Sequence, residues 1–219
     1  MSKPVLLLGT ASPEIEVLVE ALGADLISLP PMPSTEAGEL SKSWSWAKEL
    51  EQWRERTLRG ARYQKIVVAI WQQEQVGQVL VETELPQWTQ RCEVPIAWWA
   101  VALGCAQSLC SENGAVVVLI EMPSALDSEN WTAEVAVAEA AVALTRSLAR
   151  AEGARGIRFN AVTTPVRMTG NQILVAPPPP LDTFPGRLDR EVVGAVRLLL
   201  QDDACGLTGT VLHADGGRT

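Results

Sequence analysis

The side chains that could transfer a proton or bind a metal are few and widely separated in this 219-residue sequence. It has one tyrosine, Tyr63, and one histidine, His213. The four lysines, at positions 3, 42, 48 and 65, all lie in the first third of the chain. No alignment can therefore place a tyrosine four residues before a lysine. A single histidine near the C-terminus also gives little support for a Ser-His or Cys-His nucleophile.

The cysteines do not form a metal-binding pattern. Cys92, Cys105, Cys110 and Cys205 contain no Cys-x-x-Cys pair, and His213 has no ligand partner nearby in the sequence. We predict four buried free thiols and no metal site.

Three glutamates are candidates for acid/base chemistry. Glu121, Glu134 and Glu139 lie in or beside segments that bring chemical groups to the edge of a sheet in α/β proteins. Glutamates on helices are more often solvated or paired with arginine, and we expect such a pairing for Glu139.

Composition favours one compact domain over residues 1–219. The chain is 47% hydrophobic and carries a net charge of −8 with a pI of about 4.8, which disfavours binding to nucleic acid. No run of 18 apolar residues and no export signal is present, so we predict a cytoplasmic protein without a membrane partner.

Short apolar runs alternate with segments of helical period, which predicts a doubly wound α/β fold with a parallel sheet. We predict strands at Val5–Leu8, Leu26–Leu29, Ile66–Ile70, Ala115–Ile120, Ile157–Ala161 and Thr210–His213. The predicted helices are Pro13–Leu22, Leu40–Leu58, Gly77–Val81, Trp88–Cys110, Ala133–Ala151 and Arg190–Leu200. The interval from Leu29 to Ile66 shows no clear strand, so the sheet is predicted to have a shortened edge.

Three further stretches are distinctive: AAVALTRSLARAEGARGIRFNAV, EVVGAVRLLLQDDACGLTGTVLHADGG and ENGAVVVLIE. Together they resemble the short-chain dehydrogenase/reductase (SDR) superfamily. The resemblance implies a Rossmann-like fold and an NAD(P)-dependent oxidoreductase with an Asn-Ser-Tyr-Lys active site.

The four catalytic positions implied by the resemblance hold other residues. Val135 stands for the tyrosine and Glu139 for the lysine. The serine position falls at Met122, with Ser124 nearby but out of register, and Pro95 stands for the asparagine. Valine has no proton to donate, and a carboxylate would raise the pKa of a neighbouring phenol. The chain is therefore expected to lack the usual catalysis.

The glycine-rich turn that binds the cofactor in the family is also changed. Gly9 remains, but Pro13 and Ile15 occupy the other positions, and Glu14 and Glu16 bring negative charge to the helix start. We expect no cofactor here, with NAD(P) bound only where a partner subunit supplies the site.

The helices that form subunit contacts in the family are rich in small apolar residues here. The interface candidates are Trp98, Trp99, Val135, Ala138, Val142, Thr145 and Ala149. The alternative interpretation is that this face covers the sheet.

These observations lead to one hypothesis and two alternatives. The chain is predicted to be a non-catalytic subunit that assembles with an active SDR homologue in a heterodimer or heterotetramer, for example one acting on hydroxyacyl thioesters. The first alternative is a homo-oligomeric ligand sensor or scaffold. The second is an SDR oxidoreductase with a non-standard active site.

Overall fold

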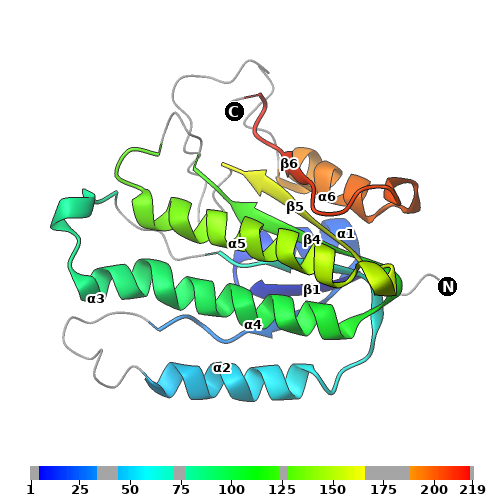
Figure 1. Ribbon diagram of the computed structural model, residues 1–219, viewed down its shortest axis with the longest axis horizontal. Coiled ribbons are helices and arrows are strands. Elements are labelled where there is room, and N and C mark those ends of the chain that lie inside the picture. The colour runs from blue at the N-terminus through cyan, green and yellow to red at the C-terminus, as the bar shows by residue number, and fades with distance from the viewer. Residues whose placement is uncertain (1–4, 34–43, 72–76, 124–127, 166–187, 218–219) are drawn as a thin grey trace.

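Six parallel strands form one continuous sheet at the centre of the protein (Figure 1). The computed structural model describes residues 5–33, 44–71, 77–123, 128–165 and 188–217. The strands, in the order β2-β1-β3-β4-β5-β6, are β1 Val5–Thr10, β2 Ala24–Leu29, β3 Tyr63–Ala69, β4 Cys110–Glu121, β5 Arg158–Thr164 and β6 Val211–His213. Each neighbouring pair is parallel, which confirms the predicted doubly wound fold.

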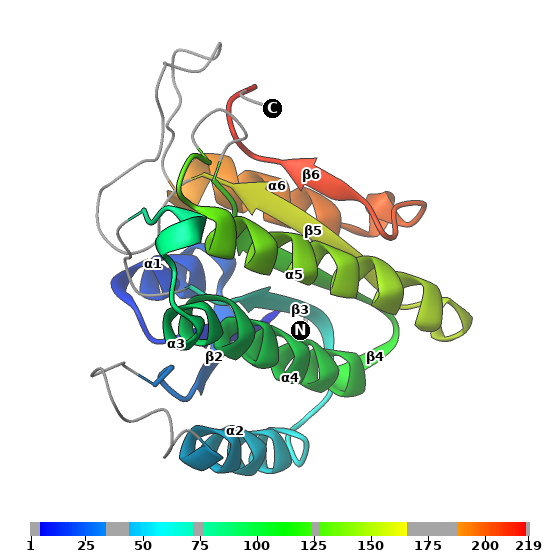
Figure 2. The same cartoon turned by 60° about the vertical axis from the view of Figure 1, so that its left-hand side comes forward.

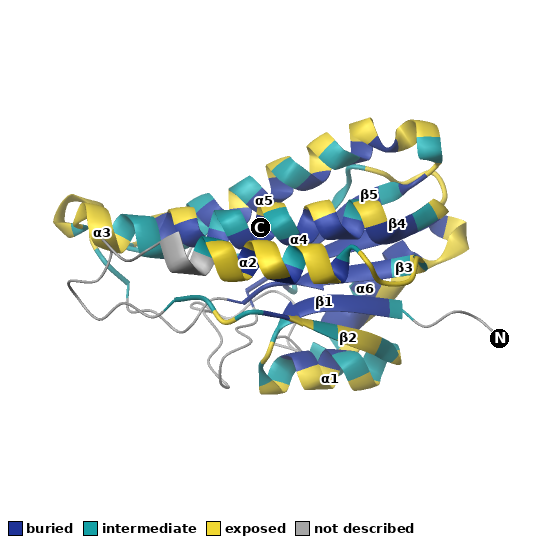
Figure 3. Cartoon of the chain, turned by 90° about the horizontal axis from the view of Figure 1, so that it is seen from below, coloured by how far each residue is buried: buried dark blue, intermediate teal, exposed yellow. Residues whose placement is uncertain are grey.

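Helices cover both faces of the sheet (Figures 1 and 2). The α-helices are α1 Pro13–Leu22, α2 Trp44–Thr57, α3 Leu85–Trp88, α4 Val94–Leu109, α5 Thr132–Ala151 and α6 Val193–Leu200. One core cluster joins α2, α4 and α5 to the sheet, and the other joins α1 and α6 to its opposite face. Figure 3 shows the buried side of the first layer turned inward and its exposed side turned to solvent.

Successive side chains along the inner strands point to opposite faces of the sheet and so fill both cores. Leu6 and Leu8 of β1 enter the core beneath α4 and α5, whereas Leu7 enters the core beneath α1. Since both faces are covered, inner strands read as continuous apolar runs rather than as alternating ones. The runs identified in the sequence are therefore the interior of the sheet.

The predicted helices differ from the observed ones near residues 77–93. The segment predicted as a helix at Gly77–Val81 forms a 3₁₀ turn at Leu80–Glu82. The helix predicted at Trp88–Cys110 is present but divided: Trp88 ends α3, a π-helical turn covers Thr89–Glu93, and α4 runs from Val94 to Leu109. Proline at position 95 has no N–H to donate to the carbonyl four residues earlier, which explains why the regular ladder starts only after this turn.

Two tryptophans tie the helical layer to the end of β2. Trp98 Nε1 of α4 donates to the Pro30 carbonyl at 3.0 Å, and Trp53 Nε1 of α2 donates to the Ser28 carbonyl at 2.7 Å. Between β2 and β3, the described residues form α2 and no strand, in agreement with the shortened edge that the sequence predicts.

The opposite end of the sheet is held by a buried polar network. Glu152 accepts hydrogen bonds from Gln107 Nε2 at 2.6 Å and from the Arg155 guanidinium at 2.7 Å. Arg155 also donates to the Cys110 carbonyl at 2.9 Å, so the end of α4, the start of β4 and the end of α5 are joined.

In the part of the chain that the structure describes, no helix is both long enough and apolar enough to span a bilayer.

Candidate functional site

Parallel strands end at the same edge of a sheet, and in open α/β folds ligands bind outside that edge where the strand order reverses. Here the order reverses between β1 and β3, because β2 lies on one side of β1 and all later strands lie on the other. The candidate site is therefore the carboxyl edge of the sheet beyond Gly9, Thr10 and Trp71. The sequence-based positions can now be placed around it.

The turn from β1 to α1 is so closely packed that it has no room for a side chain at position 9. A Cβ on Gly9 would lie 2.8 Å from Leu7 Cδ2 and 3.0 Å from both the Ala69 carbonyl oxygen and Ile15 Cδ1. Glycine is required there by the approach of β3 and α1, and Ile15 is fully buried in the core.

The first turn of α1 offers little to a phosphate. Ser12 Oγ accepts from the Ile15 N–H at 3.3 Å, which occupies a donor that a phosphate would use. Pro13 has no N–H, and Glu14 and Glu16 place carboxylates in the same turn. This turn fits the pyrophosphate of a dinucleotide poorly.

Trp71 lies just beyond β3, beside the end of β1. Its backbone N–H donates to Thr10 Oγ1 at 3.1 Å, and its side chain packs in the core beneath α1. Its indole Nε1 is buried and has no hydrogen-bond partner among the described residues. A buried donor without an acceptor is costly, so this nitrogen is a favourable contact for an acceptor atom of a ligand.

The two central catalytic positions lie on the outer side of α5. Ala138 and Ala141 face the core, while Val135 is half-buried and Glu139 is exposed. Glu139 makes no ion pair with any described residue, so the expected pairing with a local arginine is wrong. Neither side chain can supply the donor and cation that the resemblance implies.

The single tyrosine lies at the opposite end of the sheet. Tyr63 begins β3, and its hydroxyl donates to Asp25 Oδ2 at 3.3 Å. The seven residues of β3 span roughly 20 Å, so the phenol cannot reach the carboxyl edge. Burial, followed by the charge of Asp25, raises the pKa of Tyr63.

The positions that the resemblance assigns to the catalytic asparagine and serine are occupied by residues that pack within the fold. Pro95 is buried in the first turn of α4. Met122 is half-buried against the core, and its N–H donates to the Thr164 carbonyl at 2.9 Å. Ser124 lies outside the described residues.

A buried ion pair beside the start of α5 was not identified as a pair from the sequence. Arg91 Nε donates to Glu134 Oε1 at 2.9 Å, and Arg91 NH1 donates to Gln78 Oε1 at 3.1 Å. Arg91 and Glu134 side chains are 8% and 11% exposed. Glu134, one of the three candidate acid/base groups, is therefore engaged with arginine.

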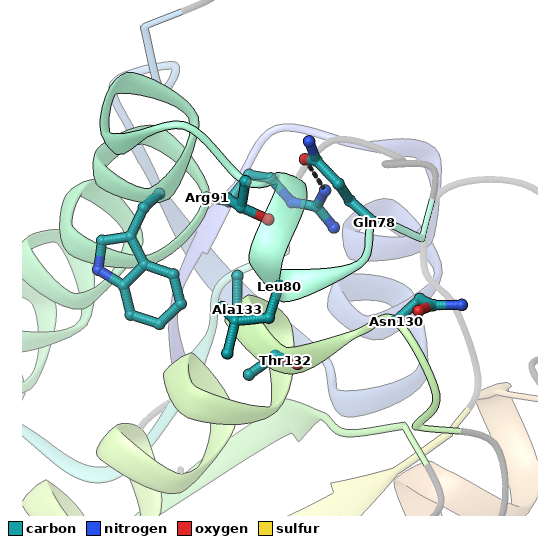
Figure 4. Close-up of a pocket in the computed structure, with 8 residues that line it drawn as sticks. Gln78, Leu80, Arg91, Asn130, Thr132 and Ala133 are labelled. Carbon is teal, nitrogen blue, oxygen red and sulfur yellow. Dashed lines mark hydrogen bonds between the residues drawn. The ribbon is translucent and has the colours of Figure 1, made fainter.

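Arg91 of this pair lines a small hollow with room for about one water molecule (Figure 4). Leu80, Thr132 and Ala133 complete much of its lining. Figure 4 shows the Arg91 guanidinium turned toward Gln78. The hollow is too small for a dinucleotide, and its residues join the segment before α4 to the start of α5.

Polar side chains also gather at the end of β6. Thr163 Oγ1 and His213 Nδ1 are 2.8 Å apart, and Asp215 Oδ1 accepts from the Gly217 N–H at 2.9 Å. Asp215 is buried, and its Oδ2 has no hydrogen-bond partner among the described residues. This carboxylate is available to a donor group at the carboxyl edge.

Most of the predicted interface residues lie inside this chain. All except Val135 are buried, and they pack α4 and α5 against each other and against the sheet: Trp98, Trp99, Ala138, Val142, Thr145 and Ala149. Thr145 Oγ1 donates to the Ala141 carbonyl at 2.8 Å within the helix. A partner at this layer would therefore contact the outer residues of the two helices.

The cysteines are free thiols. Cys92, Cys105 and Cys110 are buried as predicted, but Cys205 is exposed because it follows the end of α6 in a surface turn. No group of three metal-binding side chains occurs within the described part of the chain.

Comparison with known proteins identifies the fold. No family model and no curated protein matches the sequence. A blue fluorescent protein from a metagenomic library, in complex with NADPH, superposes with a TM-score of 0.71 at 22% identity over 100% of this chain and 98% of that one. A short-chain dehydrogenase/reductase from Serratia marcescens gives a TM-score of 0.64 at 19% identity, over 99% and 97% of the two chains.

A third structure bears on the cofactor. The enoyl-(acyl-carrier-protein) reductase from Anaplasma phagocytophilum, in complex with NAD, has a TM-score of 0.71 at 17% identity over 100% of this chain and 94% of that one. The chain thus has the Rossmann-like fold of short-chain dehydrogenases/reductases. Because two of these neighbours hold NADPH and NAD, the expectation from the sequence that no cofactor binds is overturned.

Proposed function

We propose that this chain is a non-catalytic subunit on the short-chain dehydrogenase/reductase fold, which binds a nicotinamide dinucleotide and supports an active homologue. The observation that carries the absence of catalysis is the position of Tyr63, roughly 20 Å from the carboxyl edge along β3. Val135 and Glu139 stand where a proton donor and a cation would act. A dinucleotide bound here would have no phenol beside it to donate a proton to the substrate oxygen when hydride is transferred.

The proposed ligand follows from the structural neighbours that hold NADPH and NAD. At this edge, Trp71 Nε1 is a buried donor without a partner among the described residues, and an acceptor atom of a ligand that reached it would satisfy it. The first turn of α1 supports only weak contact with the pyrophosphate, because Pro13 and the capped Ile15 N–H leave few donors. We therefore expect lower affinity than a glycine-rich turn would give.

The proposed partner is an active homologue in a heterodimer or heterotetramer. The support is that a fold which commonly performs catalysis is kept here with its core intact, while the groups for catalysis are replaced. An oligomeric partner would give such a chain a role in holding the active subunit in its assembled form.

Binding and turnover can be tested on the purified chain. We expect saturable but weak binding of NADPH or NADH by fluorescence titration, and no oxidation of the cofactor with carbonyl or enoyl-thioester substrates. Removing charge with Glu14→Gln and Glu16→Gln should tighten binding about threefold to tenfold, because like charges near a phosphate weaken it. Glu20→Gln, farther along α1, is the matched control.

Two outcomes would contradict the proposal. Cofactor turnover that is lost in Glu139→Ala would identify an oxidoreductase with a non-standard site. Native mass spectrometry of protein from its own host that recovers no homologous subunit would favour a stand-alone ligand-binding scaffold.

A further inference from the structure

The helical layer formed by α2, α4 and α5 separates two groups of charged side chains. The three helices run in the same direction, with α4 packed between α2 and α5, so their C-terminal ends share one side of the molecule (Figures 1 and 2). The central helix has no charged residue from Val94 to Leu109. The charges before and beyond this helix can therefore be compared as two separate surfaces.

Arginines gather where α2 and α5 end. Five exposed arginines make no ion pair with any described residue, and they are called the basic end below: Arg56, Arg59, Arg62, Arg146 and Arg150. Arginine in the last turn of a helix complements the helix dipole, which accounts for Arg56 and Arg150. Arg59 and Arg62 lie beyond α2 in the turn to β3, where the dipole gives them no such role.

The carboxylates on the same side of the layer are fewer than these arginines. Asp25, Glu55 and Glu112 are exposed there, and Asp25 already accepts a hydrogen bond from Tyr63. The basic end is thus locally positive on a chain with a net charge of −8.

Glutamates gather at the opposite side, where α4 and α5 begin. Four of them are exposed and make no ion pair with any described residue, and they are called the acidic end: Glu82, Glu84, Glu93 and Glu129. Arg91 is the only cation in residues 77–93 and 128–134, and its guanidinium is buried against Glu134. No cation of these two segments is therefore available to the four glutamates.

Exposed apolar side chains accompany the acidic end. Half of the eight exposed large hydrophobic residues in the described chain lie around Glu82 and Glu84: Val79, Leu80, Val81 and Leu85. Adjacent exposed apolar residues at this density indicate a contact surface. The basic end offers small exposed residues between its arginines, which leave room for apolar side chains of a partner: Gly60, Ala61, Gly153 and Ala154.

The two ends cannot meet within one chain. α4 has 16 residues and α5 has 20, so the layer is about 24 to 30 Å long. Nucleic acid and anionic lipid are poor occupants of the acidic end, since both are negatively charged. Charge complementarity points instead to a surface that carries free arginines, and the basic end of a second copy is such a surface.

We propose that copies of this chain associate head to tail, with the acidic end of one copy docked on the basic end of the next. The contact joins two different surfaces, so every copy inside a row uses both of its ends, and the row grows or closes into a ring. The outer faces of α4 and α5 take no part in it. This association is independent of the proposed function, because it requires neither a cofactor nor a homologous partner.

Neutral substitutions at each end test the proposal by sedimentation velocity over a range of concentrations. The average mass of the wild-type chain should rise with concentration and pass that of a dimer. Glu82→Gln/Glu84→Gln and Arg59→Gln/Arg62→Gln should each weaken association about tenfold or more. The glutamate variant also loses two negative charges, which lowers the general repulsion between copies, so weaker association would identify a specific contact.

A mixture of the two variants distinguishes this contact from a symmetric one. Each variant keeps one intact end, so the mixture should form a heterodimer of one copy each that grows no further. Formation of the heterodimer would also show that both variants are folded.

A matched apolar pair separates the acidic end from general surface effects. Val81→Asp should weaken association, whereas Leu198→Asp on α6 should leave it unchanged, although both residues are exposed. A monomeric wild-type chain, a wild-type mass that stops at a dimer, or two variants that fail to combine would each overturn the proposal. Docking of a different protein on the acidic end, without self-association, would overturn it as well.

Discussion

Burial makes the four thiols of this chain chemically unequal. Burial raises the pKa of Cys105 to about 11 and that of Cys110 to about 12, the latter despite the charge of Arg155. The pKa of Cys92 is also raised, chiefly by burial. Because the thiolate is the reactive form, these three thiols are protected by both protonation and inaccessibility.

Thiol labelling of the folded protein at mildly alkaline pH should therefore modify Cys205 alone. Cys205→Ser should remove the fast reaction, and denaturant should make the other three thiols reactive. Intact-mass analysis measures the number of labels directly. Fast labelling of the folded Cys205→Ser variant would show that one of the buried sites opens readily.

The Asn113 side chain and a left-handed backbone together favour glycine at position 156, just after α5. Gly156 has φ +68°, and a Cβ on it would lie 2.3 Å from Asn113 Oδ1. We expect Gly156→Ala to lower the free energy of unfolding by about 2 kcal/mol, from the left-handed backbone and the clash.

The neighbouring glycine provides the control for that substitution. A Cβ on Gly153 would meet nothing within 4 Å. Gly153→Ala should change the free energy of unfolding by less than about 0.5 kcal/mol. Urea denaturation of both variants measures the difference, and equal effects would contradict the role of the Asn113 contact.

At the scale of elements, the Arg91–Glu134 pair holds the segment before α4 against the start of α5. Both side chains are mostly buried, so removing one leaves an uncompensated charge. Arg91→Met and Glu134→Leu should each lower the free energy of unfolding by about 3 kcal/mol. The double variant should lose less than the sum, because neither charge then remains buried.

An exposed ion pair serves as the reference for this double-mutant cycle. Arg54 pairs with Glu51 on the surface of α2, where solvent screens the interaction. Thermal denaturation should show no measurable coupling for Arg54 and Glu51. Additive losses for Arg91 and Glu134 would mean that the two side chains stabilise the protein independently.

The sequence predicts elements better than it predicts their contacts. Each of the six predicted strands is present, because buried parallel strands appear as apolar runs. The start of α4 was predicted less well, since helical period alone does not show how Pro95 shifts the preceding turn. The Arg91–Glu134 pair joins residues 43 apart, which no local pattern reveals.

For the whole molecule, composition limited the chemistry more than it located the site. One tyrosine and four early lysines were enough to exclude a Tyr-x-x-x-Lys pair, and the structure places Tyr63 at the far end of β3. The same reasoning failed for the cofactor, because it rested on the changes in one turn, whereas neighbours with the same fold hold NADPH and NAD. It also treated Ala138 and Val142 as a partner surface, although a parallel sheet needs them as cover.

The strand order has a consequence for how the chain is assembled during synthesis. In this order β1 and β2 can pair first, β3 can add beside β1, and β4, β5 and β6 can then join the growing edge in the order in which they leave the ribosome. No later strand has to be inserted between two that are already paired. Domains fold preferentially from the N-terminus as they emerge, so this sheet can grow outward without rearrangement.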